Sequence, residues 1–161
     1  MILPDVNVLV HAHNADSAVH DQARRWWDTC LSGVEGVGLA WATMLGFVRI
    51  TTNRKVVARP LPVHDVMQHL QDWLALPHFH VAQPSESHFA RLRGQLERLG
   101  TAGKLTTDAH LAVLAIEREL SSIRPIPISP GFRIFAGSIR ANSPAGRWLG
   151  ARTPRLRTPP Q

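Results

Sequence analysis

The first ten residues constrain the fold more than any other stretch of the chain. They read M-I-L-P-D-V-N-V-L-V, an apolar run interrupted only by Pro4, Asp5 and Asn7. The run is short, has no helix cap before it and is apolar on both faces, so it predicts a buried parallel strand of an α/β sheet. Ligands bind at the carboxyl ends of such strands, which makes Asp5 a candidate metal ligand and Asn7 a candidate neighbour. The alternative is equally compatible with this stretch: Asp5 and Asn7 form a turn or cap the next helix.

The rest of the chain alternates amphipathic stretches with short apolar runs. Helical periodicity predicts helices over residues 20–31, 42–52, 62–75, 85–99 and 105–120, and apolar runs predict strands over 37–41 and 79–82. In the second of these helices, Leu45, Val48 and Ile50 are expected to face the core, with Arg49 on the polar side. The alternation predicts an α/β domain with a parallel sheet, whose right-handed crossovers bring the strand ends to one edge.

Asp108 lies in the first turn of the last predicted helix, with Thr106 or Thr107 as the expected cap. A carboxylate in a first turn interacts favourably with the helix dipole, and this explains Asp108 without any ligand. If the helix instead begins at the same sheet edge as Asp5, the two carboxylates would repel one another unless a divalent cation lay between them. Both interpretations are open at this point.

The charge of the chain is concentrated at one end. The net charge of +6 reflects 18 Lys and Arg against 12 Asp and Glu. Residues 1–119 contain all 12 acidic residues and 11 of the 18 basic ones, whereas the last 42 residues contain seven Arg and no acid. The excess of positive charge therefore belongs to the tail, and it does not identify residues 1–119 as a nucleic-acid-binding domain.

A chain of 161 residues with 44% hydrophobic residues is expected to form one globular domain. No apolar run approaches the ~20 residues of a membrane-spanning helix, and the first residues lack the basic segment of a signal peptide. We therefore expect no membrane association and a cytoplasmic location. Cys30 is the only cysteine, which excludes an internal disulfide and favours a buried apolar role for this residue.

Three motifs taken together resemble a known family. They are P-D-V-N-V-L-V at residues 4–10, G-F-V-R-I-T-T-N at 46–53 and T-D-A-H-L-A-V-L-A-I-E at 107–117. In this order and spacing they resemble the PIN-domain ribonucleases that serve as VapC toxins of bacterial toxin-antitoxin pairs, and in particular the mycobacterial-type branch. The resemblance covers residues 1 to about 120 and implies a PIN-like parallel sheet flanked by helices.

The resemblance also implies an activity and the residues that perform it. By position, Asp5 matches the family's acid at the first strand, and Asp108 matches the acid that opens a later helix. Both would be catalytic ligands of Mg2+, or alternatively Mn2+, in metal-dependent endonucleolytic cleavage of RNA. A VapB-type antitoxin would occupy the groove near them, and a homodimer is expected. Asn7, Arg49 and His110 are further candidates for groove or phosphate contacts.

Two departures from the family pattern affect these expectations. Many PIN domains place a Glu on the helix after the second strand, where this chain has Gly46; the mycobacterial-type branch often has G-F there. The family also continues after this region with a strand ending in D-x-D-F, whereas this chain has no acid after Glu119. The set of three or four carboxylates is thus reduced to two, which would hold a hydrated Mg2+ only weakly. A catalytically impaired remnant that retains only antitoxin binding or dimerisation is therefore the alternative function.

The tail also differs in character, and we expect it to begin at residue 121, with a last strand reaching at most about residue 128. Residues 121–161 contain seven of the 12 Pro and seven Arg, which predicts irregular packing from about Ile128 onward. With permitted codons, residues 123–140 can be encoded so that a shifted frame reads S-T-D-S-D-F-A-R-F-P-D-L-R-W-V-N-P, a string expected of a VapC. We therefore favour a frameshifted C-terminus over an unrelated basic extension. The codons were chosen to test this idea, so the match shows compatibility.

Two pairs of histidines with strand spacing, His11 with His13 and His78 with His80, suggest a weaker alternative. Side chains two residues apart on a strand lie on one face, and such a pair can bind Zn2+. Neither pair has a clear third ligand nearby in the sequence, so the carboxylate site is the favoured hypothesis.

Overall fold

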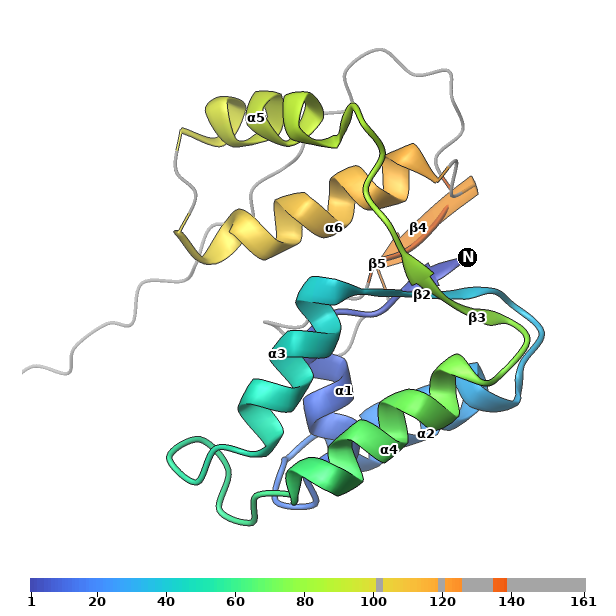
Figure 1. Ribbon diagram of the computed structural model, residues 1–161, viewed down its shortest axis with the longest axis vertical. Helices are drawn as coiled ribbons and strands as arrows, with labels where there is room; N and C mark the ends of the chain where they lie inside the picture. The colour runs from blue at the N-terminus through green and yellow to red at the C-terminus, as the bar shows by residue number, and fades with distance from the viewer. Residues whose placement is uncertain (101–102, 119–120, 126–134, 139–161) are drawn as a thin grey trace, which may run out of the picture.

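The computed structural model describes residues 1–100, 103–118, 121–125 and 135–138, and in this part of the chain five strands form one sheet flanked by six α-helices (Figure 1). The elements, in chain order, are β1 (Ile2–Leu3), α1 (Val6–His13), α2 (His20–Ser32), β2 (Val37–Ala40), α3 (Trp41–Thr51), α4 (Val63–Leu74), β3 (Phe79–Ala82), α5 (His88–Leu99), a 3-10 turn (Gly103–Leu105), α6 (Thr106–Glu117), β4 (Ser121–Pro125) and β5 (Phe135–Ser138). The predicted α/β fold is confirmed.

The shortest strand, β1, lies at the centre of the sheet, whose order is β3-β2-β1-β5-β4. On one edge β1 is parallel to β2, with Ile2 opposite Val37, and β2 is parallel to β3. On its other edge β1 is antiparallel to β5, with Ile2 opposite Ala136, and β5 is antiparallel to β4. The predicted parallel arrangement therefore holds for three strands, and the C-terminal strands extend it in the antiparallel sense.

The prediction of a strand over the whole apolar N-terminus was wrong beyond Leu3. Pro4 has no N–H to donate to a sheet, and the chain turns into α1 at Val6, with Asp5 as the residue preceding the helix. α1 is apolar on most sides because it lies between α2 and α3 and buries Val8, Leu9, Val10 and Ala12. A helix without a polar face has no amphipathic period, so its sequence resembles that of a buried strand.

The two faces of the sheet carry separate cores. α1 to α4 cover one face and α6 the other, with α5 packed against α6 (Figure 1). Ile2, Val37 and Phe79 point into the larger core, whereas Leu3, Ala40 and Ala82 point into the smaller one beneath α6. The larger core is rich in aromatic rings: Trp27 and Phe47 are fully buried, and Trp27 and Trp73 meet edge to face with their ring centroids 4.8 Å apart. Burial of such a ring contributes about 2 to 3 kcal/mol.

Several helix faces and ends differ from the predicted ones. α3 enters the core through Met44 and Phe47, while Leu45, expected inside, is 61% exposed; Arg49 is exposed, as predicted. α6 is preceded by Leu105 without a side-chain cap, and the hydroxyl of Thr106 instead donates to the backbone oxygen of Gly103. These differences arise because tertiary contacts select which side of a helix is buried.

Beyond Leu120, β4 and β5 both belong to the sheet. The expected irregular packing after Ile128 does not hold for Phe135–Ser138, because this segment pairs with the free edge of β1 and supplies partners for its backbone groups. The rest of the tail, residues 126–134 and 139–161, lies outside the described residues, and the division of the chain at residue 120 stays a prediction. None of the helices that the structure describes combines the length and hydropathy needed to cross a membrane.

Candidate functional site

Asp5 occupies the junction between β1 and α1, at the carboxyl end of the central strand. The residue is only 5% exposed. Asn7 donates a hydrogen bond from Nδ2 to Oδ2 of Asp5 over 2.9 Å, so the predicted neighbourhood of these two residues is confirmed. Asp5 precedes α1 without capping it through its side chain. The amide of Asn7 therefore orients the Asp5 carboxylate. This carboxylate does not accept a hydrogen bond from the backbone N–H groups at the start of α1.

A buried carboxylate is costly unless cations or several donors compensate its charge. The Asp5 side chain forms no ion pair with any described residue, and Asn7 is its only side-chain hydrogen-bond donor there. The positive end of α1 offsets part of this cost. The remaining carboxylate lone pairs suit a hard cation such as Mg2+, whose preferred ligands are oxygen atoms. The residues present thus fit the metal that the family resemblance implies.

The first turns of α1 and α3 pack closely beside Asp5. The hydroxyl of the buried Thr43 donates to the backbone oxygen of Pro4 over 3.1 Å. Gly46 faces Val6, and a Cβ added at Gly46 would lie 3.0 Å from Cγ2 of Val6. A Glu at this position would push against α1. At Gly46, where many PIN domains have a Glu, this chain therefore has a close contact between α3 and α1.

Asp108 lies in the first turn of α6, as predicted, and is partly exposed. It is three residues before Leu111 and seven before Ala115, so it lies on the same side of the helix as these two core residues. Leu111 and Ala115 pack in the cluster that contains Leu3, two residues before Asp5. This arrangement supports a common location for Asp5 and Asp108, but their sharing of one ion stays a prediction. Among the described residues, no group of three or more His, Cys, Asp or Glu side chains could hold a metal.

His110 does not act alone, because it belongs to a buried hydrogen-bonded chain between α5 and α6. Nδ1 of His110 lies 2.9 Å from Nε2 of His88, and Nδ1 of His88 lies 2.8 Å from Oε2 of Glu117. Glu117 also accepts hydrogen bonds from the hydroxyl of Ser85 over 2.6 Å and from its backbone N–H over 3.3 Å. Its side chain is 3% exposed. This carboxylate is thus held by several donors.

The charge state of Glu117 determines the tautomers of both histidines. Burial by itself raises the pKa of Glu117, but hydrogen bonds from Ser85 and His88 outweigh it and bring the pKa below its ordinary value. An ionised Glu117 accepts the Nδ1–H of His88, and in the neutral tautomer of His88 this leaves Nε2 as an acceptor for the Nδ1–H of His110. Burial, and then the proximity of His88, lowers the pKa of His110 and favours this neutral form. His110 is therefore oriented by α5.

The grouping of His88 and Glu117 in one polar cluster was not predicted from the sequence. A partial signal was present, because His110 and Glu117 are seven residues apart and therefore share one side of α6. His88 comes from a different helix, and its approach to both depends on how α5 packs on α6. That packing could not be read from the periodicity of either helix.

The histidine pairs with strand spacing do not form the alternative Zn2+ site. His11 and His13 lie on α1, and the ring of His13 is packed against Phe47 and Trp73, with Nδ1 2.8 Å from the backbone oxygen of Leu9. Burial in this cluster lowers the pKa of His13 to about 4. Nε2 of His78 bonds the backbone oxygen of Cys30 over 3.0 Å. His13 and His78 therefore have structural roles.

Comparison with known proteins identifies the family to which the chain belongs. No family model matches the chain. "Ribonuclease VapC37" of Mycobacterium tuberculosis is 40% identical over 123 residues, which are 76% of this chain and 85% of that protein. "Ribonuclease VapC33" of the same species is 37% identical over 117 residues, 73% of this chain and 82% of that protein. The chain belongs to the VapC family of PIN-domain ribonucleases.

A further VapC relative comes from a different species: "VapC ribonuclease Mb2897" of Mycobacterium bovis is 35% identical over 117 residues, 73% of this chain and 80% of that protein. The matches span 73 to 76% of the chain in these relatives, in line with a resemblance that ends near residue 120. The family resemblance drawn from the three sequence motifs is thereby confirmed.

Proposed function

We propose that this chain is a metal-dependent endoribonuclease that acts as the toxin of a VapBC pair. The observation that carries the proposal is Asp5, a carboxylate 5% exposed at the end of the central strand, with one amide donor and no cation among the described residues. The VapC relatives are named ribonucleases, which supports RNA as the substrate. Asp108, on the sheet-facing side of α6, is the second proposed ligand.

The protein's own contribution to the reaction is to hold and orient charge. Asp5 and Asp108 would bind Mg2+, with Mn2+ as the alternative. When bound, such an ion supplies an activated water and neutralises charge on the phosphoryl oxygens. Asn7 holds the Asp5 carboxylate in one orientation. Arg49, exposed on α3, provides a positive charge for a phosphate of the RNA.

The proposed partner is a VapB-type antitoxin that covers the groove near Asp5 and Asp108 and blocks access of RNA. A toxin with a ribonuclease site needs such a partner in the cell that makes it, and the names of the VapC relatives support this assignment. A homodimer is proposed from the family resemblance. Co-expression with candidate VapB-type antitoxins, followed by co-purification and mass measurement of any complex, tests both proposals.

Cleavage of RNA by the purified chain tests the activity. With added Mg2+ the chain should cut a labelled single-stranded RNA, and Asp108→Asn should abolish the cleavage. Calorimetry with Mg2+ and Mn2+ should show weak binding that Asp5→Asn and Asp108→Asn each diminish. Unchanged metal binding in both variants would contradict the ligand assignment, and metal-independent cleavage would contradict the mechanism.

The alternative is a catalytically impaired remnant, and the absence of any acid after Glu119 favours it. A second chain in which residues 1–120 are joined to the shifted-frame tail separates the two functions. Loss of a metal ligand or its support commonly costs ~10- to 100-fold, so the joined chain should cleave RNA at least this much faster than the present one. Equal activity of the two chains would show that Asp5 and Asp108 suffice without the tail acids.

A further inference from the structure

The solvent side of α3 carries an aromatic, an aliphatic and a basic side chain in a row. Trp41, Leu45 and Arg49 are spaced four residues apart and therefore lie on one side of the helix. Trp41 is 53% and Leu45 61% exposed, and Arg49 is also exposed. The opposite side of α3 fills the core with Met44 and Phe47. Burial in the core thus accounts for the apolar residues on the inner side of α3. The apolar residues on its outer side have no such partner among the described residues.

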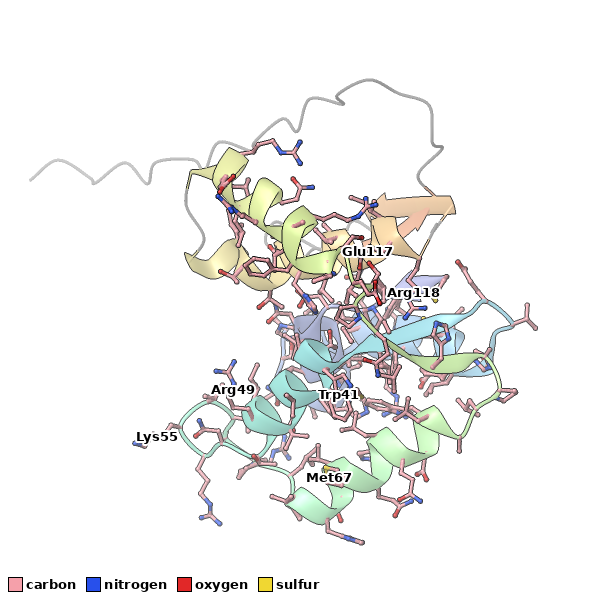
Figure 2. All side chains as sticks on the ribbon, turned by 45° about the horizontal axis from the view of Figure 1, so that its top comes forward. Trp41, Arg49, Lys55, Met67, Glu117 and Arg118 are labelled. Atoms are coloured by element: carbon pink, nitrogen blue, oxygen red, sulfur yellow. The ribbon has the colours of Figure 1, made fainter. Side chains whose placement is uncertain are left out.

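Positive charge continues from this side of α3 into the loop that follows it. Arg54 and Lys55 are exposed, and Figure 2 shows Arg49 and Lys55 projecting outward from this part of the molecule. The side chains of Arg49, Arg54 and Lys55 form no ion pair or hydrogen bond with any described residue. No Asp or Glu occurs between Glu35 and Asp65. We call Trp41, Leu45, Arg49, Arg54 and Lys55 the α3 strip.

The α3 strip begins at the sheet edge that carries Asp5. Trp41 directly follows Ala40, the last residue of β2, and β2 is the parallel neighbour of β1. The hydrogen bond from Thr43 to the backbone oxygen of Pro4 fixes the first turn of α3 against the residue before Asp5. A ligand lying along the strip therefore reaches the edge where the Asp5 carboxylate lies.

We propose that the α3 strip binds a single-stranded segment of RNA, with a base stacked on Trp41 and phosphates contacted by Arg49, Arg54 and Lys55. The inference rests on the proposed ribonuclease function and adds the surface along which the RNA strand lies. An exposed aromatic ring beside a row of free cations is the combination that binds single strands, because unpaired bases expose their faces for stacking. Bases inside a duplex are already stacked on one another.

A protein partner fits the strip less well. If two copies of the chain met through this surface, the symmetry of the contact would bring cations of one copy against those of the other. Like charges that face each other across an interface are repulsive, and the strip contains no acid to compensate them. A polyanion with exposed rings provides both complementary charge and a stacking partner.

Binding in the absence of cleavage tests the proposal. The probe is a fluorescein-labelled, ten-nucleotide single-stranded RNA, titrated with the full chain in EDTA and followed by fluorescence anisotropy. Trp41→Ala should weaken binding about 5- to 150-fold, the range for loss of one stacked base, and Trp41→Phe should restore part of it. The matched control is Phe89→Ala, which removes an aromatic ring 77% exposed on α5 and should leave the affinity unchanged.

The charge contacts have their own readout. Arg49→Gln, Arg54→Gln and Lys55→Gln should each reduce the slope of log affinity against log salt by about 0.7, the value for one phosphate contact on a single strand. Arg25→Gln is the control, because Arg25 is exposed on α2 and forms no ion pair with a described residue. A blunt duplex of the same sequence should bind more weakly than the single strand.

Four outcomes overturn the proposal: no binding of the RNA by the unchanged chain, equal affinity of Trp41→Ala and the unchanged chain, equal binding of duplex and single strand, or unchanged salt slopes. If Trp41→Ala instead converts a dimer to a monomer in sedimentation while RNA affinity is unchanged, the strip is a protein interface. Because binding is measured in EDTA, a separate failure to cleave RNA with Mg2+ counts against the proposed activity and not against the strip.

Discussion

Two buried carboxylates at the two helical layers of this protein have opposite surroundings. Glu117, in the layer of α5 and α6, accepts hydrogen bonds from Ser85 and His88 and is 3.9 Å from Nε of Arg91. Asp5, at the start of α1, has one amide donor from Asn7 and no cation among the described residues. Both are nearly excluded from water.

The burial of a carboxylate does not by itself indicate a function, because Glu117 and Asp5 are both buried and yet have different hydrogen-bond partners. A carboxylate with several donors holds its neighbours in place and is part of the fold. A carboxylate with few donors retains lone pairs for a cation, and its burial is a cost that the fold bears. We therefore attribute to Glu117 a role in the stability of the α5-α6 layer, whereas Asp5 remains the proposed metal ligand.

The largest expected effect is a loss of RNA cleavage without a loss of stability when Asp5 is substituted. Asp5→Asn should reduce RNA cleavage at least ~100-fold, because a metal ligand is lost while the shape of the side chain is kept. The free energy of unfolding should be equal or higher, since a buried charge is removed and Asn is also favourable before a helix. Cleavage assays and urea unfolding of the same preparation measure both quantities. A variant that is inactive because it is unfolded would contradict the assignment.

Glu117 should show the reverse pattern. Glu117→Ala removes the acceptor of Ser85 and His88 and should lower the free energy of unfolding by about 3 kcal/mol, measured by urea denaturation. Glu97→Ala is the control: Glu97 pairs with Arg93 over 2.7 Å on the exposed side of α5, and its loss should cost no more than ~0.5 kcal/mol. Equal losses in the two variants would remove the distinction between the buried and the exposed carboxylate.

Acidification tests a third polar group, the partly buried His13, which has a backbone acceptor and, among the described residues, no carboxylate hydrogen bond. Its pKa is lowered to about 4 from 6.5, so the unfolded chain binds more protons than the folded one between these values. Stability should therefore be highest above pH 6.5 and fall by about 2 kcal/mol by pH 4.5. Urea unfolding at pH 7 and 4.5 measures this. His13→Phe should flatten the dependence.

The smallest expected effect concerns Asn7, whose amide donates a hydrogen bond to Asp5. Asn7→Ala should reduce cleavage about 10-fold, because a carboxylate that is no longer oriented binds a metal less well. Stability should change by less than ~0.5 kcal/mol, since Asn7 is exposed. Asn14→Ala is the control: Asn14 makes a similar local bond, to the backbone N–H of Asp16, and should leave activity unchanged. A larger loss of RNA cleavage for Asn7→Ala than for Asp5→Asn would contradict the proposal that Asp5 is the ligand and Asn7 only orients it.

Local patterns predicted much of the fold and part of the site. The strand at Phe79–Ala82 and the helix beginning at His20 follow from apolar runs and amphipathic spacing. The contact of Asn7 with Asp5 could be expected because the two residues are near neighbours in the chain. The helix at Val6–His13 was missed because tertiary burial on most sides removes the polar face that marks a helix. The cluster of His88 and Glu117 was missed because it depends on two separate helices.

The two-residue strand β1 depends for its pairing on segments that lie far apart in the chain. Ile2 pairs with Val37 on one edge and with Ala136 on the other, so the second ladder joins residues that are much further apart in the sequence than the first. Pairings this distant in sequence form slowly. Asp5 directly follows this strand and Pro4, so the surroundings of the proposed metal ligand are complete only once segments far apart in the chain have come together.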